Sequence, residues 1–301
     1  MKQYIAGIGE ALWDLFPEGA KLGGAPANFA FHTSQFGLPA IAISSLGNDE
    51  LGDKAEAEFQ SKGLEYLMPR IEKPTGVVNV TLDNDGVPSY EICEGVAWDN
   101  TPFTDEIAEV AKNCQAVCWG TLSQRAQQSR ETINKFIDST PEDCIKIFDI
   151  NLRQKFYSKE IIEESLYRCN ILKINDEEIA IVAELFDLKG ENHIENCKTL
   201  LKNYDLRYVV LTCGTEGSYL LTPNGVSFRP TPKVDVADTV GAGDSFTAAF
   251  CAALLADKFE GEAHDIAVEV SAYVCTQAGA MPTLPDHLRN KLKRVKRRAT
   301  F

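Results

Sequence analysis

The stretch DTVGAGDSFTAAF (residues 238–250) decides how this chain folds and what it does. A glycine-rich turn is followed by the carboxylate of Asp244 and then by an apolar run that predicts a buried helix. A helix start exposes unpaired N–H groups and the positive end of the helix dipole. Such a corner binds anions, above all phosphate. Because phosphate would repel Asp244, the acid makes sense here if it takes a proton from a group that then attacks the phosphate.

Outward from this stretch, short apolar runs alternate with helical patterns. Helices are expected at residues 49–62, 124–139, 159–168 and 192–204. Buried strands are expected at QYIAGIG (3–9), AIAISSLG (40–47), AVCWG (116–120), IKIFDI (145–150), NILKI (170–174) and YVVLTCG (208–214). This alternation predicts a mostly parallel sheet with helices on both faces, whose ligands gather at the carboxyl ends of the strands. No linker or repeat interrupts the chain, so residues 1–301 are expected to form one domain.

One region breaks the alternation. Residues 75–94 contain two extended runs around DNDG, and Asp85-Gly86 is a strong hairpin signal. Together with ALWDLFPEGAKLGG (11–24), this hairpin predicts a small β lid formed by segments near 12–24 and 75–98. A lid would keep water away from a reactive phosphoryl group. The alternative is a surface hairpin without a function.

Composition excludes several classes of protein. The net charge of -14 argues against general binding to nucleic acid or membrane surfaces. Only the tail RNKLKRVKRR (289–298) is basic, and we expect it to be a solvated last helix. Nine scattered cysteines without a C-x-x-C indicate free thiols, and the four histidines show no zinc spacing. No signal peptide is recognisable, so the expected location is the cytoplasm.

A second segment carries chemistry at the other end of the chain. In GGAPANFAFHTSQFGLPAIAISSLG (23–47), Gly23 and Gly24 precede a helix whose first turn holds Asn28. An amide at that place offers both a donor and an acceptor to sugar hydroxyls, although it is also a common helix-start residue. The chain contains no P-loop and no protein-kinase signature.

These two segments resemble the two signatures of the PfkB carbohydrate kinase family, and the resemblance covers nearly the whole chain. It implies a ribokinase-like fold: a three-layer α/β/α core with a mostly parallel central sheet and a small β lid. Asp244 resembles the catalytic base that deprotonates the primary hydroxyl of the sugar. Gly241, Ala242 and Gly243 resemble the anion hole for the transferred phosphoryl group. The alternative for Asp244 is a helix cap.

The resemblance also implies residues on the sugar side. Asp14 matches an aspartate that binds vicinal hydroxyls, beside the glycines and the asparagine of the first signature. Trp98, in EGVAWDN, would pack against the sugar or close the lid, or else be simple packing. Arg153, in FDINLR, would reach a phosphate or the sugar, or else form a surface ion pair.

On the nucleotide side, the resemblance implies sites for ATP, Mg2+ and a monovalent cation such as K+. Asn175 and Glu178, in NDEE, match an element that organises Mg2+ and phosphates through water; the alternative is a helix cap. The remaining matches are Thr212, Gly214 and Gly217 in a strand-end turn, Gly243 beside the phosphates, Gln277 near the adenine, and Asp238, Val240 and Gly279 around the monovalent cation.

The sugar-side segments are most similar to those of bacterial fructokinases, so fructose is the expected acceptor. Alternatives are ribokinase, 2-keto-3-deoxygluconate kinase, a nucleoside or vitamin-type kinase, and a sensor on the same fold that binds sugar or nucleotide without catalysis. The exposed strand edges of the lid also predict a homodimer.

Overall fold

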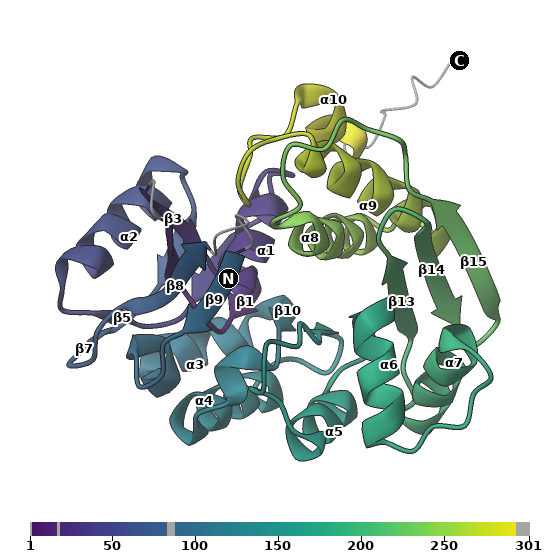
Figure 1. Ribbon diagram of the computed structural model, residues 1–301, viewed down its shortest axis with the longest axis horizontal. Helices are drawn as coiled ribbons and strands as arrows, with labels where there is room; N and C mark the ends of the chain where they lie inside the picture. Colours follow the sequence, from purple (N-terminus) through teal and green to yellow (C-terminus); the bar gives the residue numbers. More distant parts are fainter. Residues whose placement is uncertain (1, 17–18, 83–87, 293–301) are drawn as a thin grey trace.

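The computed structural model describes residues 2–16, 19–82 and 88–292, and its centre is a nine-stranded sheet (Figure 1). The strands are β1 (Tyr4–Ile8), β4 (Ala40–Ile43), β6 (Glu65–Leu67), β10 (Cys114–Trp119), β11 (Ile145–Asp149), β12 (Ile171–Asn175), β13 (Tyr208–Cys213), β14 (Gly217–Thr222) and β15 (Gly225–Pro230). Their order is β15-β14-β13-β12-β11-β10-β1-β4-β6. All neighbours from β13 to β6 are parallel, and only β14 and β15 extend the sheet antiparallel. The predicted mostly parallel sheet is confirmed.

Helices cover both faces of this sheet, because successive strand residues point to opposite sides. Ile5 therefore packs in one hydrophobic cluster and Ala6 in the other. The first face carries α1 (Ala25–Ser34), α2 (Glu50–Ser61), α8 (Ala242–Leu255), α9 (Glu260–Cys275) and α10 (Asp286–Arg289). The second carries α3 (Asp105–Lys112), α4 (Gln127–Asp138), α5 (Lys159–Arg168), α6 (Asp176–Leu185) and α7 (His193–Asn203). The expected three-layer α/β/α core is confirmed.

A small sheet of four strands stands beside this core (Figure 1). Its strands are β2 (Leu12–Phe16), β3 (Gly19–Gly23), β8 (Gly76–Leu82) and β9 (Pro88–Ile92), in the order β3-β2-β8-β9. They come from the two segments in which the sequence predicts a lid, and β8 and β9 pair antiparallel. The DNDG turn between them lies outside the described residues. One face of this small sheet packs on the core. The cluster at this contact includes Val78 and Val80 of β8, together with Leu122 and Phe156 of the core.

Short elements complete the fold. They are β5 (Leu46–Gly47), β7 (Arg70–Ile71), η1 (Ala97–Asn100), η2 (Leu122–Gln124) and η3 (Asn290–Leu292). All nine cysteines are free thiols, as expected. Among the described residues, no helix is long and apolar enough to cross a membrane. Most of the basic tail lies outside the described residues.

Candidate active site

Helix α8 begins at the glycine-rich turn. Gly241 caps it with a left-handed backbone (φ 76°), a conformation that favours glycine. Residues 245–253 are buried, as the apolar run predicts. The amide of Ala242 donates to the carbonyl of Thr239 (3.2 Å), which closes the turn. The first turn of α8 then places Asp244 at the carboxyl edge of the central sheet, where the helix dipole favours negative charge.

Helix α1 brings the second signature to the same place. Pro26 stands in its first turn, where a missing N–H costs nothing. Asn28 is 4% exposed, and its Nδ2 donates to Asp244 Oδ2 over 2.7 Å. Asn28 Oδ1 is buried and has no hydrogen-bond partner among the residues that the structure describes. A buried acceptor without a partner is costly, so this oxygen is ready to accept a hydrogen bond from a ligand.

A buried charged cluster lies beside Asp244, and the sequence reasoning did not single out its lysine. The ammonium of Lys173 on β12 lies 3.0 Å from Asp149 Oδ1 at the end of β11. Thr247 of α8 donates to Asp149 Oδ2 over 2.9 Å. A Cβ added to Gly243 would lie 2.8 Å from Lys173 Nζ, so the ammonium lies directly against the predicted anion hole. The signal was present in the sequence, because a lysine inside a buried strand needs a partner.

These charges set the protonation of Asp244. Its pKa is raised from 3.8 to about 7, first by burial and then by the negative charge of Asp149. The hydrogen bond from Asn28 and the positive charges of Lys173 and Arg153 oppose this rise. A carboxyl group with a pKa close to neutrality is suited to general base catalysis at physiological pH.

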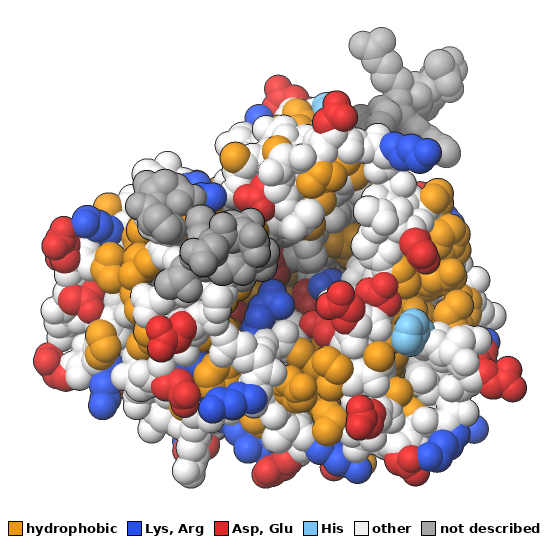
Figure 2. Space-filling model, in the orientation of Figure 1, with side chains coloured by type: hydrophobic (Ala, Val, Ile, Leu, Met, Phe, Trp, Pro, Cys, Tyr) orange, Lys and Arg blue, Asp and Glu red, His pale blue; other side chains and the backbone are white. Residues whose placement is uncertain are grey.

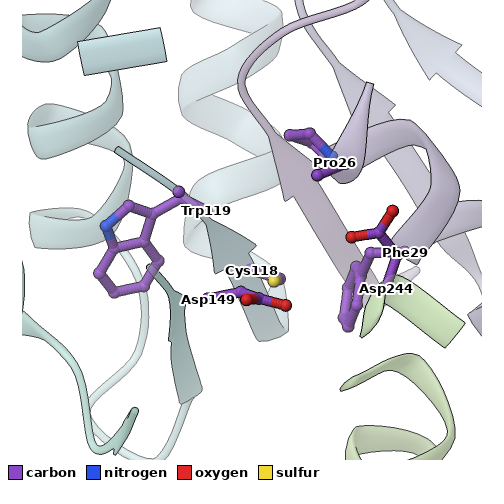
Figure 3. A pocket seen from close by; sticks show the side chains of 8 residues that line it. Pro26, Phe29, Cys118, Trp119, Asp149 and Asp244 are labelled. Atoms are coloured by element: carbon purple, nitrogen blue, oxygen red, sulfur yellow. The ribbon is translucent and has the colours of Figure 1, made fainter. Parts of the chain in front are cut away.

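Asp244 lines a small cavity. Figure 3 shows Asp244 and Asp149 at this cavity, with Pro26 and Phe29 of α1 on the side of Asp244. The other lining residues are Ala25, Cys118, Trp119 and Gly120. In the space-filling view, acidic and basic side chains gather in a hollow at the centre of the molecule (Figure 2). The site therefore combines an apolar wall with a few charged groups, as small-molecule sites commonly do.

Two of the predicted sugar-side residues, Asp14 and Gly23, belong to the small sheet. Asp14 lies on β2, and a Cβ on Gly23 would come within 3.1 Å of its Oδ2, so glycine leaves room for the carboxylate. Burial raises the pKa of Asp14, while the positive charge of Arg153 lowers it. Arg153 is exposed and acts in the same way on Asp244. Gly24 has a φ of 120°, and an added Cβ would lie 2.3 Å from the carbonyl oxygen of Glu10.

Glu10 is a second residue that the sequence reasoning missed. It is 4% exposed, accepts a short hydrogen bond from Ser123 and accepts another from the amide of Ala25 over 3.3 Å. Burial raises the pKa of this carboxyl group. Glu10 thus joins the end of β1 to the start of α1, the helix that carries Asn28.

Trp98 lies at the base of the small sheet. It is 1% exposed and packs under the guanidinium of Arg125, whose Cζ is 4.0 Å from the ring centroid. Arg125 in turn forms a buried ion pair with Asp99 over 2.8 Å. These contacts bury the ring of Trp98, and its contact with a sugar stays a prediction.

Asn175 and Glu178 form a capping box at the start of α6. Asn175 Oδ1 accepts from the amide of Glu178 (2.8 Å), and Glu178 Oε2 accepts from the amide of Asn175 (2.9 Å). Glu178 Oε1 accepts from the amide of Leu152 (2.9 Å). Asn175 and Glu178 thus cap helix α6, as the alternative interpretation expected. A role of these residues in binding Mg2+ would come in addition to this capping. Thr212 is the direct neighbour of Asn175 on β13.

The structure brings the three predicted cation ligands together. Asp238 Oδ1 accepts from the amide of Val240 (3.0 Å), and its Oδ2 accepts from the amide of Gly279 (3.1 Å). Gln277 lies two residues before Gly279, and its Nε2 donates to Thr276 Oγ1. The other two predicted nucleotide-side glycines, Gly214 and Gly217, make contacts that hold the fold together. Thr231 donates to the carbonyl of Gly214 over 2.7 Å, and a side chain on Gly217 would strike β15.

Comparison with known proteins agrees with this geometry. An uncharacterized sugar kinase of Pyrococcus horikoshii is 30% identical over 270 residues, which are 83% of this chain and 82% of that protein. Its structure has a TM-score of 0.82 at 26% identity, covering 96% of this chain and all of that one, and a second structure of it contains ATP.

Two further relatives differ in substrate. The aminoimidazole riboside kinase of Salmonella typhimurium is 26% identical over 298 residues (92% of this chain, 91% of that protein). The fructokinase of Rhizobium leguminosarum bv. trifolii is 26% identical over 264 residues (83% and 79%). The family model described as pfkB family carbohydrate kinase matches residues 19–287. The chain therefore belongs to the pfkB family of carbohydrate kinases, phosphotransferases with an alcohol group as acceptor, and has the ribokinase-like fold.

Proposed function

We propose that this protein is an ATP-dependent fructokinase, which transfers the γ-phosphoryl group of ATP to a primary hydroxyl of fructose. The observation that carries the proposal is the contact between Asp244 and Asn28. Asp244 stands at the start of the buried helix α8 and has a pKa of about 7. Its hydrogen bond with Asn28 connects it to α1, the helix that directly follows the sugar-side glycines. A sensor that only binds its ligand gains nothing from an acid placed beside phosphate.

In this proposal each residue has a defined task. Asp244 accepts the proton of the sugar hydroxyl as that oxygen attacks the phosphorus. The first-turn amides of α8 stabilise the negative charge of the transferred group, and Gly241 gives it close access. Lys173, lying against Gly243, adds a positive charge on the same side. Asn28 orients Asp244 through Nδ2 and accepts from the sugar through Oδ1.

The oxygen ligands near the phosphate side fit Mg2+, which prefers carboxylates and water. Glu178 is the proposed residue, and water would mediate its contact because both carboxylate oxygens already accept backbone hydrogen bonds. Bound Mg2+ would neutralise charge on the ATP phosphates. For K+, the proposed ligands are the carboxylate of Asp238, whose oxygens accept from the amides of Val240 and Gly279, and the backbone carbonyls of these two residues.

The choice of fructose rests on the segment GEALWDLF and on fructokinases among the relatives. The riboside kinase of similar identity makes a nucleoside the main competitor. A few hydrogen bonds decide between such acceptors. When the wrong acceptor leaves a buried polar group of the enzyme unpaired, the rate falls by orders of magnitude.

The deciding experiment measures ADP release with ATP and Mg2+ across a panel of acceptors. The panel contains fructose, ribose, 2-keto-3-deoxygluconate, glucose, aminoimidazole riboside and no acceptor, each with and without K+. We expect a preference for fructose, and a loss of roughly 10²–10⁴-fold in kcat for Asp244→Asn. The matched control is Asp105→Asn, which removes an acid from the first turn of α3. Near-normal turnover by Asp244→Asn would refute the base assignment, and silence with every acceptor would favour the sensor.

We further propose a homodimer formed through the small sheet. Its outer strands, β3 and β9, have no further strand neighbour among the described residues, and such edges favour pairing with another chain. Size-exclusion chromatography with light scattering is expected to give twice the mass of the chain. A strict monomer at high concentration would refute this assembly.

A further inference from the structure

Helix α1 carries a polar stripe that the proposed reaction does not yet use in full. Asn28, His32 and Gln35 follow each other at spacings of four and three residues, so they share one face of the helix. Asn28 meets Asp244. The other two side chains meet the segment 279–284, which follows α9.

His32 is a buried histidine with two hydrogen-bond partners. It is 0% exposed, and its Nε2 lies 2.8 Å from the carbonyl oxygen of Ala280. A carbonyl oxygen only accepts, so Nε2 carries the proton and Nδ1 accepts from Gln35 Nε2 over 3.4 Å. Burial lowers the pKa of His32 to about 4, which keeps the ring neutral at physiological pH and preserves this arrangement.

Gln35 holds the same segment further along. Its Nε2 donates to the carbonyl of Pro282 (3.2 Å), and its Oε1 accepts from the amide of Leu284 (2.7 Å). Helix α1 and its C-cap residue Gln35 therefore make three hydrogen bonds to the backbone of residues 280–284. An apolar residue at position 32 would fill the same space but would leave a buried carbonyl without its donor, at a real cost.

The clamped segment forms the wall of the anion hole. A Cβ added to Gly241 would lie 2.6 Å from the oxygen of Ala280 and 2.9 Å from its Cα, so the two backbones touch. One residue earlier, the amide of Gly279 donates to Asp238 Oδ2. A displacement of Ala280 would therefore move Gly241, where α8 begins, and Asp238, in the turn before it.

We propose that His32 is a positioning residue for phosphoryl transfer, which fixes Ala280 against Gly241 and thereby holds the first turn of α8 in its reactive geometry. One stripe of α1 then orients both the base, through Asn28, and the anion hole, through His32. The proposal concerns the rate of transfer and rests on the kinase activity proposed above. Positioning effects of this kind act on kcat, because a small displacement at the reacting groups is costly.

The test compares His32→Leu, which keeps the volume and removes the donor, with His32→Gln, which keeps a donor. The matched control is His264→Leu. His264 is also 0% exposed, has a pKa lowered to about 4, and contacts Ser218 and the ring of Phe246, neither of which lines the cavity. We expect His32→Leu to lower kcat 10- to 100-fold, with KM for the sugar changed less than threefold. His32→Gln should recover most of this loss, and His264→Leu should keep kcat within twofold at a similar loss of Tm.

A second measurement separates this inference from the proposed function. Amide hydrogen exchange over residues 238–244 is expected to become at least tenfold faster in His32→Leu and to stay unchanged in His264→Leu, without any substrate. Unchanged exchange, or a kcat within twofold of the parent protein, would overturn the positioning role. Equal loss of kcat in the two leucine variants would overturn it as well. A parent protein without kinase activity refutes the proposed function, and the exchange data then decide on His32 alone.

Discussion

At the scale of the residue, the environment of Asp244 explains why an acid stands at a phosphate-binding corner. Its pKa of about 7 arises first from burial and then from the charge of Asp149. Lys173 neutralises part of that charge, since its ammonium pairs with Asp149. The motif around Asp244 singled out this residue, and its role as the base stays a proposal. It did not predict Lys173, because that lysine meets Asp149 only when β11 and β12 pair in the folded sheet.

The pH dependence of catalysis follows from this pKa. The base must be ionised, so kcat/KM is expected to fall about tenfold per pH unit below pH 7 and to level off above it. Asp149→Asn should move this midpoint lower by roughly one pH unit, because it removes a neighbouring negative charge. The measurement is initial rates between pH 5.5 and 8.5 at saturating ATP. A flat profile across this range would contradict the assignment of Asp244 as the base.

Stability should depend on the same group. The folded-state pKa of Asp244 is raised from 3.8 to about 7, so the unfolded state ionises first as pH rises, and folding stability falls across that window. Above pH 7 the penalty is complete, at up to about 4 kcal/mol, since the window spans about three pH units and each is worth about 1.4 kcal/mol. Asp244→Asn is therefore expected to be more stable than the parent protein at pH 8.

The gain of Asp244→Asn should shrink as the pH falls from 7 and vanish near pH 4. Urea unfolding at several pH values measures it, with Asp105→Asn as the control. A variant that is less stable than its parent at pH 8 would show that the carboxylate, despite its burial, stabilises the folded chain.

At the scale of the element, strands and helices followed from hydrophobic patterns, while their neighbours in space did not. The helices expected at 49–62, 159–168 and 192–204 match α2, α5 and α7 to within a residue at each end. The helix expected to begin at Gln124 begins at Gln127, because a 3-10 turn over Leu122–Gln124 comes first. Patterns within one segment carry no information on pairing, so the position of β1 between β10 and β4 had to come from the structure.

The junction between turn and helix at Gly241 offers a test at this scale. Gly241→Ala would place a methyl group 2.6 Å from the Ala280 oxygen in a left-handed conformation. We expect a loss of about 2–4 kcal/mol, from strain and overpacking together, and a kcat reduced at least tenfold. Gly63→Ala is the matched control, because Gly63 has a φ of 66° and open space around it.

Gly63→Ala should cost only about 1 kcal/mol, the price of a left-handed alanine, and leave kcat unchanged. Thermal unfolding and steady-state kinetics of the two variants decide the question. Should Gly241→Ala retain full kcat, the turn would serve the fold and contribute nothing to phosphoryl transfer.

At the scale of the whole molecule, the proposed sugar contacts come from two separate bodies. Asp14 belongs to the small sheet, whereas Asn28 and Asp244 belong to the core. Direct links from the small sheet to the core include a bond from Trp13 Nε1 to the carbonyl of Leu51 (2.9 Å) and one from Gln154 Nε2 to the carbonyl of Tyr90 (2.7 Å). The sequence predicted the segments of this sheet, but its links to the core join residues far apart in the chain and left no local pattern.

A sugar that bridges Asp14 and Asp244 must hold the small sheet against the core, so we expect fructose to slow amide hydrogen exchange in β2 and β8 by at least tenfold. The protection should disappear in Asp14→Ala, because the bridge has then lost its end on the small sheet. Asp138→Ala is the control, since Asp138 of α4 pairs with Arg168 of α5 in the helical layer opposite α1 and α8. It should keep the full protection. If fructose protects only α1 and α8, or protects β2 equally in Asp14→Ala, the small sheet does not close on the sugar and its function as a lid is refuted.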